Sequence, residues 1–333
     1  MKKVISLLLV FAMIFAFAAC GEKKTNEPET TTEAPLSAVT INVATLKGPS
    51  GVAMVKLMED AETKTAKNDY KFSLLDNPKN AAAGIISGEY DIASVPVNMA
   101  SVLYNKLDGK VVLLSADTKG VLYLLEQGDT IHSIADLAGK KVYATGKGAT
   151  PEHIFNYILE KNNLTDKVEV EYLSTHDELM TKAAAGEVAI SILPQPKVTV
   201  ATMKNPKLRV ALDLTEEFEK VSDNANLIMG VVVARRDFVE KNPEAVKMFL
   251  QEYKASVDYI STNLDETANL CEKFGVIPKA PMAKAAIPKC NIVYMDGKNM
   301  MDSVKANLEL FFNADPKSIG GKLPGDDLYF SAN

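Results

Sequence analysis

The sequence predicts an α/β protein of two doubly wound lobes, with a ligand cleft between the lobes and a hinge formed by two chain crossings. Three observations predict this fold. Short β-rich runs alternate with longer helical runs from Val39 onward, the same order recurs after residue 120, and an apolar run at 227–234 returns the chain to the first lobe. We therefore expect lobe I at 39–120 plus 228–333 and lobe II at 121–227. Alternation of this kind is typical of parallel sheets.

The elements of the two predicted lobes follow one another in the same order. In lobe I we expect strands at 40–45, 71–75, 91–95 and 111–116, and helices at 51–67, 79–87 and 98–106. In lobe II we expect strands at 141–145, 168–173, 189–193 and 208–212, and helices at 151–162, 177–185 and 196–204. Beyond the strand at 227–234 we expect only helices, at 242–260, 266–274, 280–287 and 298–312. These helices should pack on lobe I, which places the crossings near 120–125 and 226–230.

Two ten-residue segments repeat one pattern, at 87–96 and 185–194. Each has a glycine that ends a helix, then a short apolar strand, then a proline that ends the strand. The pattern is also an ordinary corner of doubly wound folds. We favour the interpretation that each corner presents a loop to a shared cleft.

Each predicted lobe also has a glycine-bearing turn between its first strand and first helix, at 45–51 and 145–152. In open α/β sheets ligands bind at the carboxyl ends of strands, where such turns lie. Thr150 is suited to cap a helix that starts at Pro151, which leaves backbone amides for an anionic or polar group. Neither turn matches a P-loop or G-x-G-x-x-G, so we do not expect a nucleotide.

The N-terminus reads as a bacterial lipoprotein signal. Two lysines precede an apolar run from Val4 to Phe17, and small residues precede Cys20. The run is too short to span a membrane. We expect a signal peptide at 1–19, lipid attachment at Cys20, and a disordered tether at 20–38 that is rich in Thr, Glu, Pro and Lys. The protein should then be extracytoplasmic and anchored to the cell membrane.

Composition excludes several classes of function. The net charge of −6 becomes −8 without Lys2 and Lys3, and no basic cluster predicts nucleic-acid binding. The remaining cysteines, Cys271 and Cys290, are expected to be buried free thiols, with a disulfide as the alternative. The three histidines lack metal-ligand spacing, so we expect surface or capping roles and neither a metal nor a cofactor. They are His132, His153 and His176.

Taken together, these features resemble the extracellular solute-binding proteins of ABC importers. The likeness rests on the signal around Cys20, the two turns, the paired corners and the segment 236–250. In that segment Phe238, Pro243 and Phe249 form the pattern Phe-x4-Pro-x5-Phe. Within that family it is similar to the branch for nitrate, sulfonates, taurine and pyrimidine precursors of thiamine. The resemblance implies a monomeric periplasmic binding protein of type II that carries a small organic solute to a membrane permease driven by a separate ATPase.

The resemblance also implies where the solute binds. The family's cleft positions fall on Lys47, Gly48, Ser50, Pro96, Asn98, Thr145, Lys147, Ala149, Thr150, Pro194 and Gln195. Asn98 and Gln195 each follow a strand-ending proline and offer both donors and acceptors. Their alternatives are helix capping for Asn98 and a solvated loop for Gln195. Lys47 and Lys147 either supply positive charge to an anion or are simply solvated, and no arginine lies in either turn.

Two other functions stay open at this point. One is an enzyme on the same scaffold that makes a precursor of the thiamine pyrimidine or of menaquinone. No catalytic constellation of His, Cys and carboxylates converges on the predicted cleft, which disfavours it. The other is a lipoprotein that senses a solute and signals to a membrane kinase. The sequence leaves the identity of the solute open.

Overall fold

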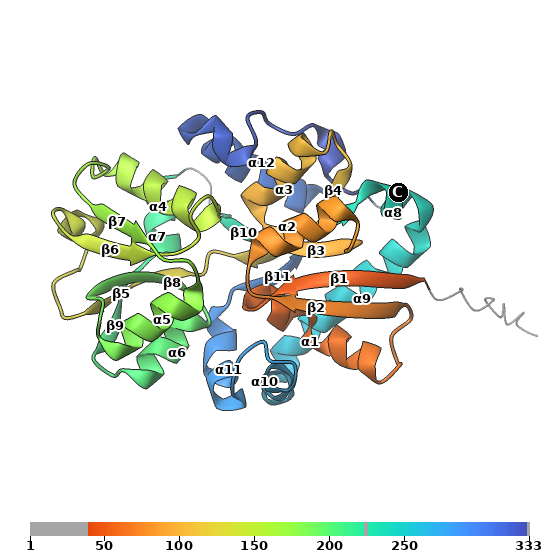
Figure 1. The fold of residues 1–333 in the computed structure, drawn as a ribbon, viewed down its shortest axis with the longest axis horizontal. Helices are drawn as coiled ribbons and strands as arrows, with labels where there is room; N and C mark the ends of the chain where they lie inside the picture. Colours follow the sequence, from red (N-terminus) through yellow and green to blue (C-terminus); the bar gives the residue numbers. More distant parts are fainter. Residues whose placement is uncertain (1–38, 223–225, 332–333) are drawn as a thin grey trace, which may run out of the picture. The chain divides into compact units, whose positions relative to one another are not determined.

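Two β-sheets organise the computed structural model, which describes residues 39–222 and 226–331 (Figure 1). The predicted signal peptide, Cys20 and the predicted tether lie outside the described residues. No helix in the described part of the chain is long and apolar enough to cross a membrane. We call the six-stranded sheet with its helices lobe I and the five-stranded sheet with its helices lobe II. The boundaries at 120 and 228 stay a prediction.

Lobe I contains a sheet in the order β11-β4-β10-β3-β1-β2. Its strands are β1 (Thr40–Leu46), β2 (Asp69–Leu75), β3 (Ile92–Pro96), β4 (Val111–Lys119), β10 (Ile228–Arg235) and β11 (Ile292–Met295). β1 pairs in parallel with β2 and β3, whereas β10 runs antiparallel between β3 and β4. The edge strand β11 is antiparallel to β4.

Lobe II contains a sheet in the order β7-β6-β8-β5-β9. Its strands are β5 (Leu122–Gln127), β6 (Lys141–Ala144), β7 (Glu169–Tyr172), β8 (Ile190–Pro194) and β9 (Leu208–Asp213). β6 pairs in parallel with β7 and β8, and β5 runs antiparallel between β8 and β9. Position by position, this order repeats the order β2-β1-β3-β10-β4 of lobe I.

The α/β class with two sheets is confirmed, but the expectation of parallel sheets is wrong in one respect. Each sheet contains a central antiparallel strand that the chain inserts directly after changing lobes. β5 follows β4 into lobe II, and β10 returns from lobe II into lobe I. A second correction concerns the C-terminal part, which is not wholly helical because β11 extends the lobe I sheet by one edge strand.

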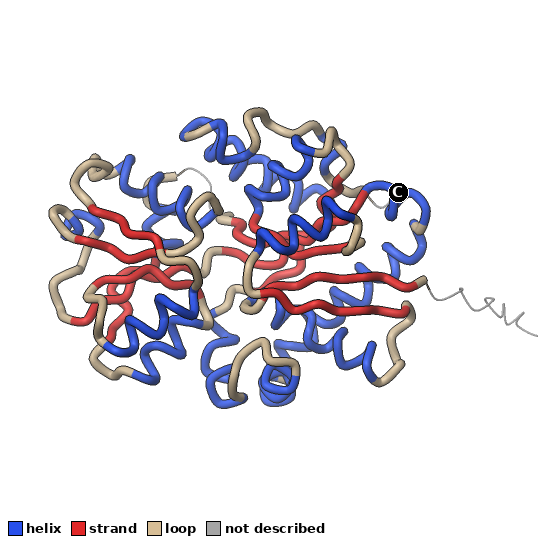
Figure 2. Tube along the Cα trace, viewed as in Figure 1, coloured by secondary structure: helices blue, strands red, loops and turns tan. Residues whose placement is uncertain are grey.

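Helices cover both faces of the sheets (Figures 1 and 2). In lobe I they are α1 (Pro49–Glu62), α2 (Pro78–Ser87), α3 (Val97–Lys106), α8 (Arg236–Lys241), α9 (Pro243–Thr262), α10 (Leu264–Lys273), α11 (Ala280–Ala286) and α12 (Gly297–Ala314). In lobe II they are α4 (Thr150–Lys161), α5 (His176–Ala185), α6 (Lys197–Lys204) and α7 (Leu214–Glu219). Short 3₁₀ turns occur at Ile134–Leu137, Ile287–Lys289, Pro316–Ile319 and Asp326–Leu328.

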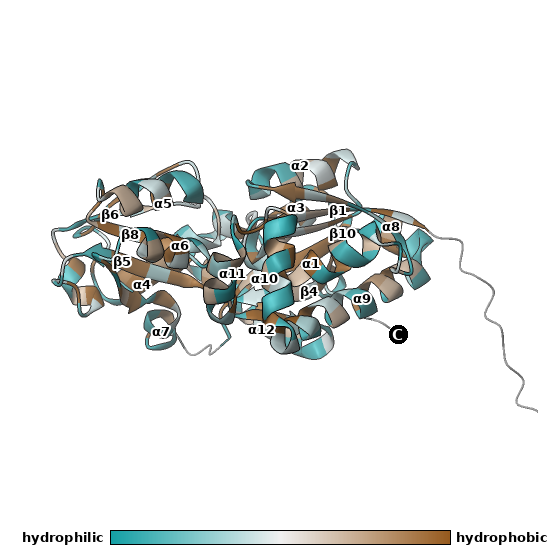
Figure 3. Ribbon diagram, turned by 90° about the horizontal axis from the view of Figure 1, so that it is seen from below, coloured by the Kyte–Doolittle hydropathy of each residue, from teal (hydrophilic) through white to brown (hydrophobic). Residues whose placement is uncertain are grey.

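The apolar periodicity of the helices explains how they pack. In α9 the buried residues Val246, Phe249, Leu250 and Tyr253 recur at i, i+3, i+4 and i+7, which places them on one face. This face joins the core between the lobe I sheet and α1. Figure 3 shows the same division: the strands are largely brown, whereas the outer faces of helices such as α10 are teal.

Candidate functional site

The carboxyl ends of the parallel strands in both lobes open onto one cleft. A helix follows each of the strands β1, β2, β3, β6, β7 and β8, so six helices also begin there. Their first residues are Pro49, Pro78, Val97, Thr150, His176 and Lys197. The first turn of a helix carries unpaired N–H groups and the positive end of the helix dipole. The fold therefore surrounds the cleft with groups that attract negative charge.

Two adjoining cavities occupy this cleft. The narrower has a volume of about 120 Å³ and the wider about 510 Å³. Both are lined by residues of lobe I and of lobe II, and they share Lys47, Pro96 and His176 among others. Prolines and aliphatic side chains dominate the narrow cavity, whereas polar groups of the turn 145–149 line the wide one. Together the two cavities suit one small molecule with chemically different ends.

The structure brings most of the predicted site residues to these cavities. Those that line at least one cavity are Lys47, Ser50, Pro96, Thr145, Lys147, Ala149, Pro194 and Gln195. Three others lie beside the cavities without lining them, namely Gly48, Asn98 and Thr150. A contact between any of these residues and a solute remains a prediction.

Asn98 forms a bridge between the lobes. Its side chain is buried, and its Oδ1 accepts a hydrogen bond from Thr150 Oγ1 at 3.0 Å. Its Nδ2 donates to the carbonyl oxygen of Ser318 at 2.9 Å and to that of Gly148 at 3.5 Å. The whole amide is thus occupied by protein groups from both lobes. In this arrangement Asn98 holds the start of α4 against lobe I.

Gln195 is oriented differently. Its Oε1 accepts from the Thr199 amide at 3.2 Å and from Thr199 Oγ1 at 2.9 Å, so it caps the start of α6. A flipped amide would set its NH₂ group against the Thr199 N–H, so the hydrogen bonds fix the orientation. No described residue accepts a hydrogen bond from Nε2, which is therefore available to a ligand in the narrow cavity.

Lysines give the cleft a positive charge. Lys47 pairs with Asp76 at 2.9 Å, and Lys197 pairs with Asp177 at 2.5 Å. Lys79 and Lys147 line the wide cavity, and neither has an ion-pair partner among the described residues. The arginines lie elsewhere in ion pairs with acidic side chains: Arg209 with Glu126, Arg235 with Asp237, and Arg236 with Asp327. Recognition of an anion would thus rely on ammonium groups and helix N-termini.

His176 corrects the expectation that all three histidines have surface or capping roles. It is the first residue of α5 and lines both cavities, and its Nδ1 lies 2.5 Å from Thr145 Oγ1. Burial, and then the charge of Lys197, lowers the pKa of His176 to about 4, so the ring is neutral at neutral pH. Its position between β7 and the start of α5 is the sequence signal that could have identified this residue.

His132 and His153 lie away from the cleft. His132 is exposed, as expected for a surface residue. His153 belongs to α4 and packs against Phe311 of α12 with 5.9 Å between ring centroids, so it lies between the lobes. Burial lowers the pKa of His153 below its ordinary value.

Asp117 is a second residue that the sequence analysis missed. It is fully buried in β4, directly behind the narrow cavity, and its Oδ1 accepts from Thr118 Oγ1 at 2.7 Å. Desolvation raises the pKa of Asp117 to about 6, although the hydrogen bond from Thr118 opposes the shift. The available sequence signal was an aspartate that directly follows the apolar run Val111–Ala116. A charge buried in a strand is costly unless it is hydrogen-bonded or paired, so such a residue is a candidate for a special role.

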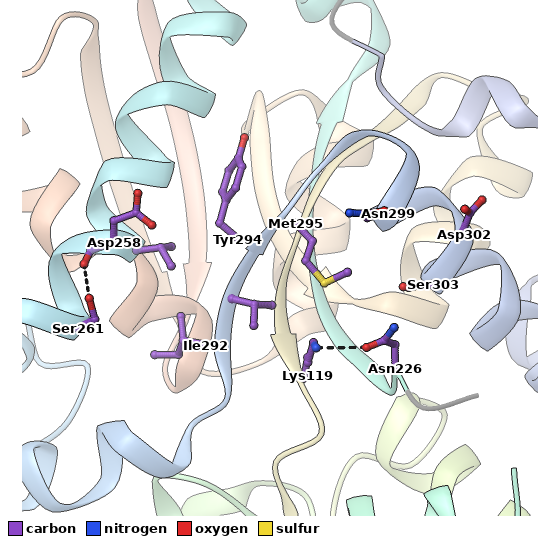
Figure 4. A pocket seen from close by; sticks show the side chains of 12 residues that line it. Lys119, Asn226, Asp258, Ser261, Ile292, Tyr294, Met295, Asn299, Asp302 and Ser303 are labelled. Atoms are coloured by element: carbon purple, nitrogen blue, oxygen red, sulfur yellow. Dashed lines mark hydrogen bonds between the residues drawn. The ribbon is translucent and has the colours of Figure 1, made fainter. Parts of the chain in front are cut away.

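Figure 4 shows a larger cavity, of about 700 Å³, that none of the predicted site residues lines. Parts of α9, β11 and α12 form its wall, together with Lys119 and Asn226, which are hydrogen-bonded at 3.2 Å. Asp258 and Asp302 in its lining are paired with Lys254 and Lys298. Because the strand ends and helix starts lie at the interlobe cleft, we take the cleft as the functional site.

The described residues contain no group of three or more His, Cys, Asp or Glu side chains placed to hold a metal ion. Cys271 and Cys290 are both free and buried, and burial raises the pKa of each thiol to about 12. Neither feature adds a reactive group to the cleft.

One protein-family model matches most of this chain. A family model described as menaquinone biosynthesis matches residues 53–286, from within α1 to the end of α11. The chain belongs to this family. The matched region includes nearly all of the residues that line the interlobe cleft. Among curated proteins, no match is found.

Solved structures of similar proteins share the fold. An ABC transporter protein from Parabacteroides distasonis is 26% identical, with a TM-score of 0.74 over 88% of this chain and 99% of that one. The periplasmic aliphatic sulphonate binding protein SsuA from Escherichia coli is 17% identical, with a TM-score of 0.69 over 86% and 96%. The periplasmic nitrate-binding protein NrtA from Synechocystis PCC 6803 is 13% identical, with a TM-score of 0.59 over 74% and 69%. The likeness to the last two shows the fold alone.

We expect the protein to lose stability when the Asn98 side chain that bridges the lobes is removed. Asn98→Ala leaves Thr150 Oγ1 and the Ser318 carbonyl without their partner, so the free energy of unfolding should fall by about 1–3 kcal/mol. Urea denaturation without any solute measures it. The exposed Asn80 provides the control, because Asn80→Ala should change stability by less than about 0.5 kcal/mol. Equal stability of Asn98→Ala and the wild type would contradict the bridging role.

We expect the buried carboxyl of Asp117 to make the stability of the protein depend on pH. Because its folded-state pKa is raised from 3.8 to about 6, the wild type loses stability as pH rises through this window, where the unfolded chain gives up the proton first. Asp117→Asn removes this loss. The difference in unfolding free energy, variant minus wild type, should therefore increase between pH 4 and 6 and then level off. Urea titrations at several pH values would measure it, and a constant difference would contradict the buried carboxyl.

Proposed function

We propose that this protein is a membrane-anchored substrate-binding protein that captures a small organic anion and delivers it to an ABC import permease. The observation that carries the proposal is the interlobe cleft, where six helix N-termini and the unpaired Lys79 and Lys147 converge on two joined cavities. Such a site stabilises negative charge without a reactive group. The fold shared with sulphonate- and nitrate-binding proteins supports an anionic solute.

The side chains that line the cleft favour binding over catalysis, because few of them are reactive. His176 is the histidine that lines the cavities, and its pKa of about 4 makes it a poor general base at neutral pH. Thr145 is its nearest polar partner, and no described cysteine or unpaired carboxylate lines the cleft beside it. The bound solute should therefore leave the protein unchanged.

The second candidate is an enzyme of menaquinone precursor synthesis, and the family match is the observation that favours it. The two functions differ in the fate of the bound molecule. Mass spectrometry of small molecules released from purified, denatured protein would identify the molecule. Incubating that molecule with fresh protein would then distinguish the two, because conversion to a compound of different mass requires an enzyme.

The anionic nature of the solute is testable at the two unpaired lysines. The double substitution Lys79→Gln with Lys147→Gln should weaken binding of the released molecule roughly tenfold, because each charge contributes on the order of 0.3–1 kcal/mol at such exposed positions. It should also reduce the salt dependence of binding. Calorimetry at low and moderate salt measures both effects.

Lys322→Gln is the matched control for the lysine substitutions. Lys322 is exposed and lines neither cavity, so its loss changes the net charge without changing the cleft. Equal affinities of the double variant and of this control would contradict anion recognition by Lys79 and Lys147. A released molecule that carries net positive charge would contradict the proposal as a whole.

Anchoring through Cys20 is a separate part of the proposal, because this residue lies outside the described part of the chain. Cys20→Ser should move the protein from the membrane fraction to the soluble extracytoplasmic fraction, since the thiol that would carry the lipid is gone. Solute binding by the purified variant should equal that of the wild type. Fractionation followed by immunoblotting tests it, and a variant that stays in the membrane fraction would exclude this anchor.

A further inference from the structure

The narrow cavity is lined by polar groups from opposite lobes. Ser50 and Thr118 line it from lobe I, and Gln195 lines it from lobe II. All three side chains are at least nine-tenths buried, with exposed fractions of 7%, 4% and 2%. Lys47, His176 and Lys197 also line the cavity, and the rest of the lining is largely proline and aliphatic, so a few polar groups decide what the cavity accepts.

The carboxylate of Asp117 determines how the Thr118 hydroxyl can interact. Thr118 Oγ1 donates its proton to Asp117 Oδ1 at 2.7 Å, while Asp117 Oδ2 is buried without a hydrogen-bond partner among the described residues. A hydroxyl has one proton, and an ionised carboxylate can only accept. Once this proton is directed to Asp117, the Thr118 hydroxyl has only lone pairs to offer the cavity. The lobe I side of the cavity is therefore a hydrogen-bond acceptor.

The lobe II side is a hydrogen-bond donor. Gln195 uses its Oε1 for both hydrogen bonds from Thr199, which leaves the N–H groups of Nε2 for the cavity. A group bound between the lobes thus meets acceptors on one side and a donor on the other. A hydroxyl satisfies both sides, and so does a carboxamide.

Gly230 allows Asp117 to lie this close to the cavity. Gly230 lines the narrow cavity, and a Cβ at this position would lie 2.3 Å from Asp117 Oδ1. The carboxylate therefore occupies the space that any side chain at residue 230 would need. This packing fixes the carboxylate behind Thr118.

We propose that the narrow cavity selects an anion whose far end carries a hydroxyl or carboxamide group, and that Asp117 enforces this choice as a positioning residue. The inference rests on the proposed function, in which the wide cavity holds the anionic end. A methyl group in this place would leave buried polar atoms unpaired. An ammonium group offers nothing to Gln195 Nε2, and it would face Lys47 and Lys197, which also line the cavity.

The test uses pairs of anions that differ only by a hydroxyl in place of a methyl group. The pairs are 4-hydroxybutyrate with pentanoate, 4-hydroxybenzoate with 4-methylbenzoate, and 2-hydroxyethanesulfonate with propane-1-sulfonate. Calorimetry on full-length protein freed of bound solute compares the members up to millimolar concentration. In every pair that binds, the hydroxyl member should bind at least about tenfold more tightly.

Two variants test the role of Asp117. Asp117→Asn lets Thr118 keep its proton for the ligand, so the preference for the hydroxyl member should fall below about threefold. Thr118→Val removes the acceptor with little change of shape and should reduce the preference in the same way, which covers the case in which Asp117→Asn does not fold. Asp166→Asn, at an exposed position outside both cavities, should keep the wild-type preference.

The outcomes separate this inference from the function on which it rests. Equal affinities within every bound pair, or a preference that survives both variants, would overturn the inference and leave anion binding intact. Failure of all six anions to bind the wild type would overturn anion capture, and the inference with it. A preference that both variants abolish and that Asp166→Asn retains supports the inference.

Discussion

The architecture depends on the exchange of one antiparallel strand between the two sheets. After β4 the chain passes into lobe II, where β5 lies between β8 and β9. The chain later returns to lobe I, where β10 lies between β3 and β4. Both inserted strands are hydrogen-bonded along both edges, so neither can leave its sheet without breaking two ladders. The lobes are thereby joined by two short segments, and the carboxyl ends of both sets of parallel strands line one cleft.

This constraint also determines the electrostatics of the cleft. A helix follows each parallel strand, so the helix starts collect at the same place as the strand ends, and their dipoles add. Lys79 and Lys147 increase the positive potential on the wide side. The negative charge of Asp117, whose neighbour Thr118 lines the narrow cavity, accepts a hydrogen bond from the Thr118 hydroxyl. The cleft is thus polarised from one end to the other, which favours a solute with two unlike ends.

Local signals in the sequence predicted the frame of this site, and tertiary contacts decided the rest. The corners that end at Pro96 and Pro194 follow from local backbone chemistry, and both prolines line the cleft. The strand β5 was not predicted, because the segment 120–125 was assigned to the first chain crossing. Its Glu126 is buried, so the charge needs partners. Arg209, at 2.7 Å, and the backbone amides of Thr130 and Ile131 compensate that charge. The two amides are local, whereas Arg209 comes from another part of the chain. No local pattern shows that Asn98 and Thr150, 52 residues apart, would meet across the lobes.

The contact between Asn98 and Thr150 links the solute to the arrangement of the lobes. Thr150 begins α4, and the turn before it lines the wide cavity, so an anion there holds the same segment that Asn98 holds. A ligand shifts an equilibrium only by its different affinity for the two states. A solute that contacts both lobes therefore stabilises the arrangement that the Asn98 bridge already stabilises. On the proposed function, Asn98 would contribute to affinity through the position of α4, although it lines neither cavity.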